Sequence, residues 1–305
     1  MRGREGAVAL AIAALAAVLV LAAPRFYAAD NLRDVFLATL PVLIVALGTT
    51  LVLLTGEIDI SCGSMFAVCS VIGGVLAKAT GSVALALIGA CAAGAMLGAL
   101  NGVLVAYAGI PSIVVTLASM VALRDGLRWA TGGTWVADLP LSFQWLGLGQ
   151  AAYPSAAAAT TLVLVGVAAW TLGQVGTGRA VYAVGSNAAA ARLAGVRVER
   201  VKGIVFALAG TLTAIAAVVN AVRFSQVPSN SGLGLEMKVV AAAVVGGVAV
   251  TGGRGTIAGA VLGVVLLGIV GPALTFLGVT AYWERALQGA IILAAVGIEA
   301  WRRRA

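Results

Sequence analysis

The stretch LGQVGTGRAVYAVGSNAAAARLAGVRVERVKG, residues 172–203, is the largest basic island in a sequence that is otherwise mostly apolar. It holds five lysines and arginines against one acid, Glu199. Basic loops of membrane proteins tend to face the cytoplasm. We therefore expect residues 174–202 to form a cytoplasmic loop that acts on a cytoplasmic partner or on the membrane surface.

Composition places the chain among integral membrane proteins. Hydrophobic residues make up 62% of its 305 residues, charged residues only 10%, and the mean hydropathy is +1.09. Soluble domains are about a quarter charged. The net charge of +8 is spread over segment ends and forms no patch interleaved with aromatic residues, so we expect no nucleic-acid partner.

Several classes of chemistry are excluded by missing residues. The sequence has no histidine, which removes the usual general base and the common nucleophile pairs. None of its three lysines stands in a phosphate-binding GxxxxGK[ST] loop. The three cysteines lie in apolar runs without CxxC spacing. We expect no enzyme activity, no metal site and no cofactor on this chain.

The apolar runs predict an all-α integral membrane protein with about ten transmembrane helices, forming a single domain over residues 1–305. The first run resembles a secretory signal, but we expect it to be retained because the rest of the chain is membrane-embedded. The runs cover residues 7–23, 39–55, 62–79, 84–107, 112–130, 155–173, 203–222, 239–250, 256–277 and 286–301.

Charge predicts the orientation of these spans. With ten spans and a cytoplasmic N-terminus, eleven of the nineteen lysines and arginines face the cytoplasm, concentrated in the central loop and the C-terminal tail. Both termini are then cytoplasmic. Four tryptophans fall at the opposite interface, as an aromatic belt would place them: Trp129, Trp135, Trp145 and Trp283.

Two glycine faces recur five spans apart. An odd offset gives the two halves opposite orientations, the inverted-repeat plan of many transporters, and such faces let helix backbones pack closely. The alternative is that glycines align by chance in a sequence rich in small residues. The faces are Gly94, Gly98 and Gly102 in the fourth span, and Gly255, Gly259 and Gly263 at the start of the ninth.

Polar residues inside the apolar region are candidates for the translocation pathway or its gate. TGEIDISCGS, residues 55–64, places Glu57, Asp59 and Ser61 between two apolar helices. A carboxylate at bilayer depth costs about 2.5–3.5 kcal/mol on insertion scales, so it usually faces a pathway or a partner. The alternative is a turn in which Asp59 or Ser61 caps the next helix.

Three amides also lie in apolar helices: Asn101, Asn220 and Gln288. We count Asn101 and Asn220 as pathway candidates. The alternative is that these amides hydrogen-bond between helices without touching a substrate.

The basic island contains a short predicted helix. Ser186 or Asn187 is a suitable N-cap, residues 188–194 are strong helix formers, and Gly195 suits the left-handed position after a helix. A helix of two turns is marginal in water, so it needs a surface to dock on. We expect that surface to be another protein; the alternatives are the chain's own loops or anionic lipid.

Three segments resemble the permease subunits of ATP-binding-cassette sugar importers, the family of the ribose, xylose, rhamnose and autoinducer-2 permeases. They are LGTTLVLLTGEIDISCGSMFAVCSVIGGVLA (47–77), GTGRAVYAVGSNAAAARLAGVRVERVKGIVFALAG (176–210) and VVAAAVVGGVAVTGGRGTIAGAVLGVVLLGIVGPAL (239–274). They occur in the family's order. The chain departs from the usual pattern at Glu57, where a glycine or small residue is commoner, and TGEIDIS is nearer to the rhamnose and autoinducer-2 branches.

The resemblance implies a bacterial inner-membrane transporter for a monosaccharide or an autoinducer-2-like molecule. Its partners are a second permease copy or paralogue, ATPase subunits that carry ATP and Mg, an extracytoplasmic sugar-binding protein, and membrane lipid. Residues 186–195 are similar to the coupling helix that enters the ATPase. The docking residues it implies are Ser186, Asn187, Ala191, Arg192, Leu193, Gly195 and Arg197.

A rival interpretation is an ion-coupled secondary transporter in which Glu57 and Asp59 bind the proton or cation. The central helix discriminates between the two, because a self-powered carrier needs no docking element.

Overall fold

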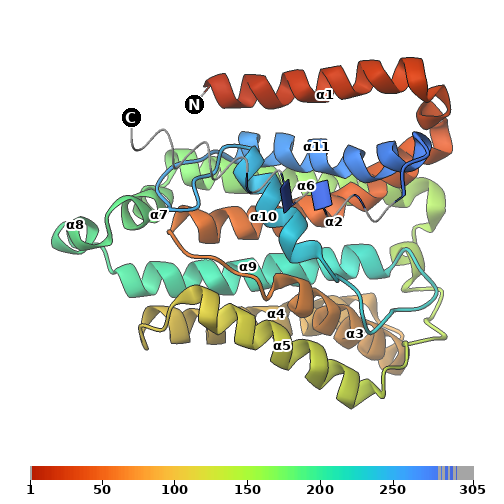
Figure 1. Cartoon of the computed structure of the whole chain (residues 1–305). Helices are drawn as coiled ribbons and strands as arrows, with labels where there is room; N and C mark the ends of the chain where they lie inside the picture. The colour runs from red at the N-terminus through yellow and green to blue at the C-terminus, as the bar shows by residue number, and fades with distance from the viewer. Residues whose placement is uncertain (1, 281–282, 284–285, 288, 291–292, 294–305) are drawn as a thin grey trace.

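The computed structural model describes residues 2–280 and positions 283, 286, 287, 289, 290 and 293. This part of the chain is helical, apart from an isolated antiparallel bridge between Val136 and Val227. Most of the long helices lie side by side (Figure 1). The α-helices, long and short, are α1 Arg2–Ala22, α2 Ala29–Leu54, α3 Cys62–Thr80, α4 Val83–Ala106, α5 Ser112–Thr131, α6 Gly149–Gln174, α7 Gly176–Ser186, α8 Ala188–Leu193, α9 Val198–Ala221, α10 Leu235–Val245 and α11 Ile257–Phe276. Two 3-10 turns, η1 Pro24–Tyr27 and η2 Gln144–Gly147, lie between them.

Seven helices of the described residues are long and apolar enough to cross a membrane: α1, α2, α3, α4, α6, α9 and α11. They confirm an all-α fold of multi-pass membrane character, with fewer full spans than the ten expected. The fifth expected span does form a helix, α5, of 20 residues. It carries Arg124, Asp125 and Arg128 near its C-terminal end and is not among the seven.

The span expected at residues 239–250 forms a helix of nearly the expected length that begins four residues earlier, α10 Leu235–Val245, and it is too short to cross a bilayer. α10 has 11 residues, about 16 Å of helix, whereas a bilayer core is about 30 Å thick. The helix ends where Gly247 takes a φ of 92°, a left-handed conformation that glycine adopts without steric cost. The tenth expected run, residues 286–301 with Gln288, lies largely outside the described residues.

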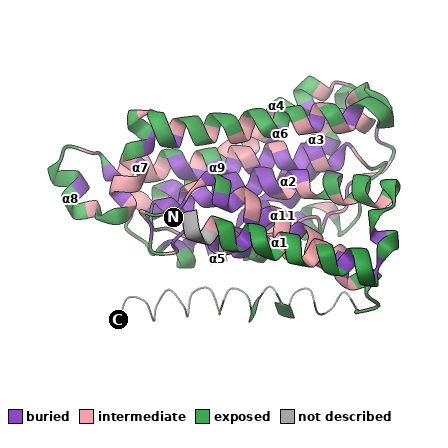
Figure 2. Cartoon of the chain, turned by 90° about the horizontal axis from the view of Figure 1, so that it is seen from above, coloured by how far each residue is buried: buried purple, intermediate pink, exposed green. Residues whose placement is uncertain are grey.

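α2 and α9 form the centre of the bundle. Both are largely buried, and they pack against each other and against most other helices (Figure 2). The outward faces of α1, α4 and α6 are exposed in the isolated chain. Met96 on α4 and Leu162 on α6 are 72% and 68% exposed. Such large apolar side chains at the surface suit a hydrocarbon surrounding.

Two helical hairpins flank this central pair. The α3–α4 hairpin packs on α9, while the α10–α11 hairpin packs on α2. α1 lies on α11, where Leu19, Phe26 and Ala273 form a small buried cluster. The Thr256 hydroxyl at the start of α11 donates to Glu5 Oε1 of α1 at 2.6 Å. α1 therefore contacts the bundle mainly through α11.

The two glycine faces seen in the sequence lie at close helix contacts. A methyl group on Gly94 would come within 2.8 Å of the Ala214 Cβ, and one on Gly102 within 3.0 Å of the Gly203 Cα, both on α9. Gly98 approaches the same helix, against the Phe206 carbonyl. On the second face, Gly259 and Gly263 lie against the backbone of α10 and its C-terminal end, and Gly255 lies against Val248.

Candidate functional site

The basic island of residues 172–203 folds into α7 and α8, which project from one end of the bundle (Figure 1). Asn187 is the N-cap of α8, and its side-chain oxygen accepts the Ala190 N–H at 3.0 Å. Gly195 follows the helix with a φ of 83°. The short helix predicted from the sequence is thus confirmed, with Asn187 as its cap and a left-handed glycine after its last turn.

The two faces of α8 differ. Ala191 is buried against Val184 and Val198, so this face holds the helix to its own loop. Leu193 points outward with 92% of its surface exposed. Of the other expected docking residues, Arg192 pairs with Glu199, while Ser186, Asn187, Gly195 and Arg197 are exposed. A partner that binds at this end would contact an exposed leucine side chain surrounded by polar and basic groups.

α8 is linked to the membrane helices by a contact that we call the glycine junction, formed by Leu54, Gly185 and Gly253. The Gly253 N–H donates to the Leu54 carbonyl at 3.0 Å. A methyl group on Gly185 would approach the Gly253 nitrogen to 2.6 Å and would overlap the Leu54 carbonyl. Three segments far apart in the chain therefore meet backbone to backbone.

The segment between α2 and α3 begins at this junction and carries Glu57. The Glu57 carboxylate accepts a hydrogen bond from the Lys202 ammonium near the start of α9, and forms an ion pair with it. The two side chains are 14% and 20% exposed. Lys202 was not predicted as the partner of Glu57, because the two residues are 145 positions apart.

Asp59 lies deeper and is hydrogen-bonded at the start of α3. It is 3% exposed, and its Oδ1 accepts the Ser61 N–H at 2.8 Å and the Ser61 hydroxyl at 2.5 Å. Burial raises the pKa of the Asp59 carboxyl, whereas the two hydrogen bonds from Ser61 act in the opposite direction. This is the arrangement of a local turn that leads into a helix.

Asn101 extends this polar cluster across helices. Its amide donates to the Ser61 hydroxyl at 3.0 Å, and its carbonyl oxygen accepts from the Ser119 hydroxyl at 2.6 Å. The amide thus joins the start of α3 to α4 and α5. This geometry supports the interhelical role for Asn101, which the sequence left as one of two alternatives.

The N-terminal ends of α3 and α10 meet next to this segment. A methyl group on Gly63 would overlap the carboxylate of Glu236 and would come within 2.6 Å of the Gly232 carbonyl oxygen. Glu236 is 8% exposed, and its Oε2 has no hydrogen-bond partner among the described residues. This carboxylate was not among the predicted site residues. The sequence feature that could have identified Glu236 is a single acidic residue in the stretch LGLEMK, at the edge of an apolar run.

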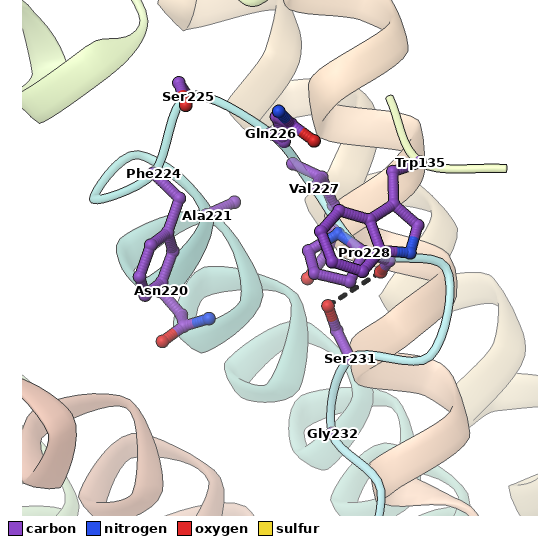
Figure 3. A pocket seen from close by; sticks show the side chains of 11 residues that line it. Trp135, Asn220, Ala221, Phe224, Ser225, Gln226, Val227, Pro228, Ser231 and Gly232 are labelled. Atoms are coloured by element: carbon purple, nitrogen blue, oxygen red, sulfur yellow. Dashed lines mark hydrogen bonds between the residues drawn. The ribbon is translucent and has the colours of Figure 1, made fainter. Parts of the chain in front are cut away.

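A cavity that we call the Trp135 cavity (Figure 3) lies at the C-terminal end of α9, whereas α8 precedes the N-terminal end of that helix. Its volume is about 350 Å³, the size range of a site for a small molecule. It is bounded by α3, the C-terminal end of α9 and the segment leading to α10. The lining residues are Ser70, Trp135, Asn220, Ala221, Phe224, Ser225, Gln226, Val227, Pro228, Ser231 and Gly232.

Polar groups on this cavity's wall are incompletely paired. Ser70 is 1% exposed, and its hydroxyl has no hydrogen-bond partner among the described residues. The amide of Asn220 and the ring of Trp135 lie on opposite sides of the view in Figure 3. Buried polar groups are normally hydrogen-bonded. A hydroxyl-rich ligand in the cavity would meet the Asn220 amide as a hydrogen-bonding group and the Trp135 ring as an apolar face, whereas the Ser70 hydroxyl lies beneath the cavity surface.

Comparison with known proteins now identifies the family. The family described as the permease component of the branched-chain amino acid transport system matches residues 31–296. The chain belongs to this permease family. Family membership, together with the seven apolar spans, makes this permease a multi-pass inner-membrane protein.

Three similar proteins carry the name autoinducer 2 import system permease protein LsrC. The one from Enterobacter sp. (strain 638) is 37% identical over the whole of this chain and 89% of its own length. The one from Escherichia coli (strain K12 / DH10B) is 37% identical over 92% of this chain and 84% of its own. The one from Yersinia pestis (strain Pestoides F) is 35% identical over 95% and 83%. No solved structure matches the permease.

The resemblance noted in the sequence is thereby confirmed at the level of the family. The structure separates the predicted pathway residues of this permease into distinct places. Glu57 pairs with Lys202 near the start of α9. One buried cluster is formed by Asp59, Ser61 and Asn101. Asn220 lines the Trp135 cavity.

Proposed function

We propose that this permease is the membrane subunit of an ATP-driven importer for a small polyhydroxylated molecule, either a monosaccharide such as a deoxy sugar or pentose, or an autoinducer-2-like compound. The relatives named as autoinducer 2 import permeases support this substrate class. A separate ATPase provides the energy, and an external binding protein delivers the substrate.

The observation that carries the proposal is the exposed helix α8 with its rigid connection to the bundle. The Leu193 side chain is exposed, whereas the opposite face of α8 packs on its own loop. The preceding helix, α7, contacts the glycine junction through Gly185. A helix that is exposed and also firmly connected to the bundle is suited to bind another protein and to follow the movement of that protein. ATP binding to the ATPase would move α8, and the movement would reach α2 and the Glu57 segment.

The contacts between helices support a plan of two inverted halves. The α3–α4 hairpin packs on α9 in the same way that the α10–α11 hairpin packs on α2, and α2 and α9 contact each other in the centre. In inverted-repeat transporters, helix N-termini meet near the middle of the membrane, where the substrate passes. The meeting of α3 and α10 at Gly63 and Glu236 fits this plan. From the charge distribution of the sequence we also propose that both termini are cytoplasmic.

The rival ion-coupled mechanism has less support in the geometry. A proton or cation site needs a carboxylate that is free to exchange its ligand. Glu57 is held by Lys202, and Asp59 is held by two hydrogen bonds from Ser61.

Reconstitution of the permease with the ATPase and binding protein of its own transporter tests the proposal. Leu193→Asp should abolish coupling of ATP hydrolysis to uptake while membrane insertion stays normal, because a charge replaces the apolar contact. Ser155→Asp, at an exposed position at the other end of the molecule, is the control and should leave coupling intact. Uptake by the permease alone under an ion gradient would overturn the proposal.

A further inference from the structure

A second cavity, of about 570 Å³, lies along the side of the bundle, near α8. We call it the α6–α9 groove. Both α6 and α9 pack on α2, and Leu47 and Leu51 of α2 lie at its floor. Val167 of α6 and Ile204 and Leu208 of α9 line its walls and are 55%, 52% and 47% exposed. The groove is therefore apolar and open toward the lipid.

The length of the groove matches one leaflet of a bilayer. Its lining on α9 extends from Arg200 to Leu212, a rise of about 18 Å along the helix. Half of a bilayer's hydrocarbon core is about 15 Å. An acyl chain that enters the groove would reach from the level of Arg200 to about the middle of the membrane.

The end of the groove nearest α8 is basic. Arg197 and Arg200 line it, and both are exposed. Within the described residues neither arginine has a salt bridge, because the neighbouring acids are taken: Glu199 pairs with Arg192 and Glu57 pairs with Lys202. Guanidinium groups bind phosphate through paired hydrogen bonds. Two of them above an apolar groove suit an anionic headgroup attached to an acyl chain.

We propose that the α6–α9 groove binds one anionic phospholipid of the cytoplasmic leaflet, with its phosphate at Arg197 and Arg200 and an acyl chain along Ile204 and Leu208. α7 lines the opposite wall through Gly178 and Val181 and leads directly into α8. The lipid thus fills a cavity beside the element that connects α8 to the bundle. This site is separate from the Trp135 cavity and does not depend on the transported substrate.

Native mass spectrometry of the full chain in detergent tests the site, with phosphatidylglycerol and phosphatidylcholine of identical acyl chains as probes. Phosphatidylglycerol should be retained more tightly than phosphatidylcholine. Arg200→Gln should weaken its retention about fivefold, the effect of one basic residue at an anionic surface. Arg25→Gln is the matched control, because it removes the same charge from an exposed position in η1, outside the groove, and it should leave retention unchanged.

A groove-filling variant separates this site from general attraction to the membrane. Ala168→Trp should displace both lipids, and Val167→Trp, at a half-exposed position, serves the same purpose if the first variant does not fold. Equal losses for Arg200→Gln and Arg25→Gln, or no preference for phosphatidylglycerol, would overturn the proposal. So would a Leu208→Cys variant that cross-links two permease copies in native membranes, because the groove would then be a protein interface.

Discussion

The glycine junction joins α7 to the C-terminal end of α2, whereas the Trp135 cavity lies at the C-terminal end of α9. Polar groups are paired at the junction and, within the part of the chain that the structure describes, left unpaired at the cavity. At the junction, the backbone groups of Leu54 and Gly253 are paired and no space remains for a side chain. At the cavity, the Ser70 hydroxyl is buried without a partner among the described residues. The junction is thus a fully paired, close-packed contact, whereas a hydroxyl with no partner in the described part of the chain is buried beside the cavity.

The largest effect is expected where the junction is overfilled. Gly185→Ala should abolish transport and lower the thermal unfolding midpoint, because its methyl would overlap the Leu54 carbonyl and overpacking costs about 1–3 kcal/mol. Gly173→Ala is the matched control, since a methyl there meets no atom within 4 Å. Uptake assays and thermal melts of both variants check this; equal behaviour would show that the junction tolerates side chains.

The next effect concerns the ion pair beside the junction. Lys202→Met leaves the Glu57 carboxylate without its partner in a mostly buried place, and breaking such a pair costs about 3 kcal/mol. The exchange Glu57→Lys with Lys202→Glu should recover part of the loss in thermal stability. If the double variant is no more stable than the sum of the two single changes predicts, the pair does not hold the segment to α9.

At the Trp135 cavity, activity and stability should change in opposite directions. Ser70→Ala removes a buried hydroxyl that has no partner within the described part of the chain, so the permease should become slightly more stable, by up to about 1 kcal/mol. Uptake should fall severalfold if the hydroxyl contacts the passing substrate. Transport kinetics and thermal melts on one preparation measure both, and Thr161→Val, at a buried hydroxyl bonded within its own helix, is the control. Unchanged uptake by Ser70→Ala would remove this cavity from the pathway.

The smallest effect is expected at Asp59. Asp59→Asn keeps an oxygen that can accept the Ser61 N–H, so stability and uptake should stay close to those of the unaltered permease. Asp59→Ala removes the acceptor of both Ser61 hydrogen bonds and should cost about 1 kcal/mol, the lower end of the cost of leaving a buried donor without a partner. Strong loss of uptake in Asp59→Asn with intact assembly would instead make the charge part of the pathway.

Much of the fold was predictable because its signals are local. Apolar runs identified seven full spans, and the sequence from Ser186 to Gly195 predicted α8 with its cap and its terminal glycine. The described residues do not confirm the count of ten spans, and α10 shows where local signals are weak. α10 is half a span, because Gly247 turns the chain and no apolar pattern records the depth at which a helix begins.

The sequence by itself determined the class of protein, the family and the exposed basic helix, since composition, caps and hydrophobic runs act over a few residues. Only the tertiary structure decided which polar groups meet: Glu57 with Lys202, Ser61 with Asn101, and Glu236 with Gly63. These pairs are separated by tens to more than a hundred residues. Their contact depends on how the helices close around α2 and α9, and no short-range preference of the chain specifies it.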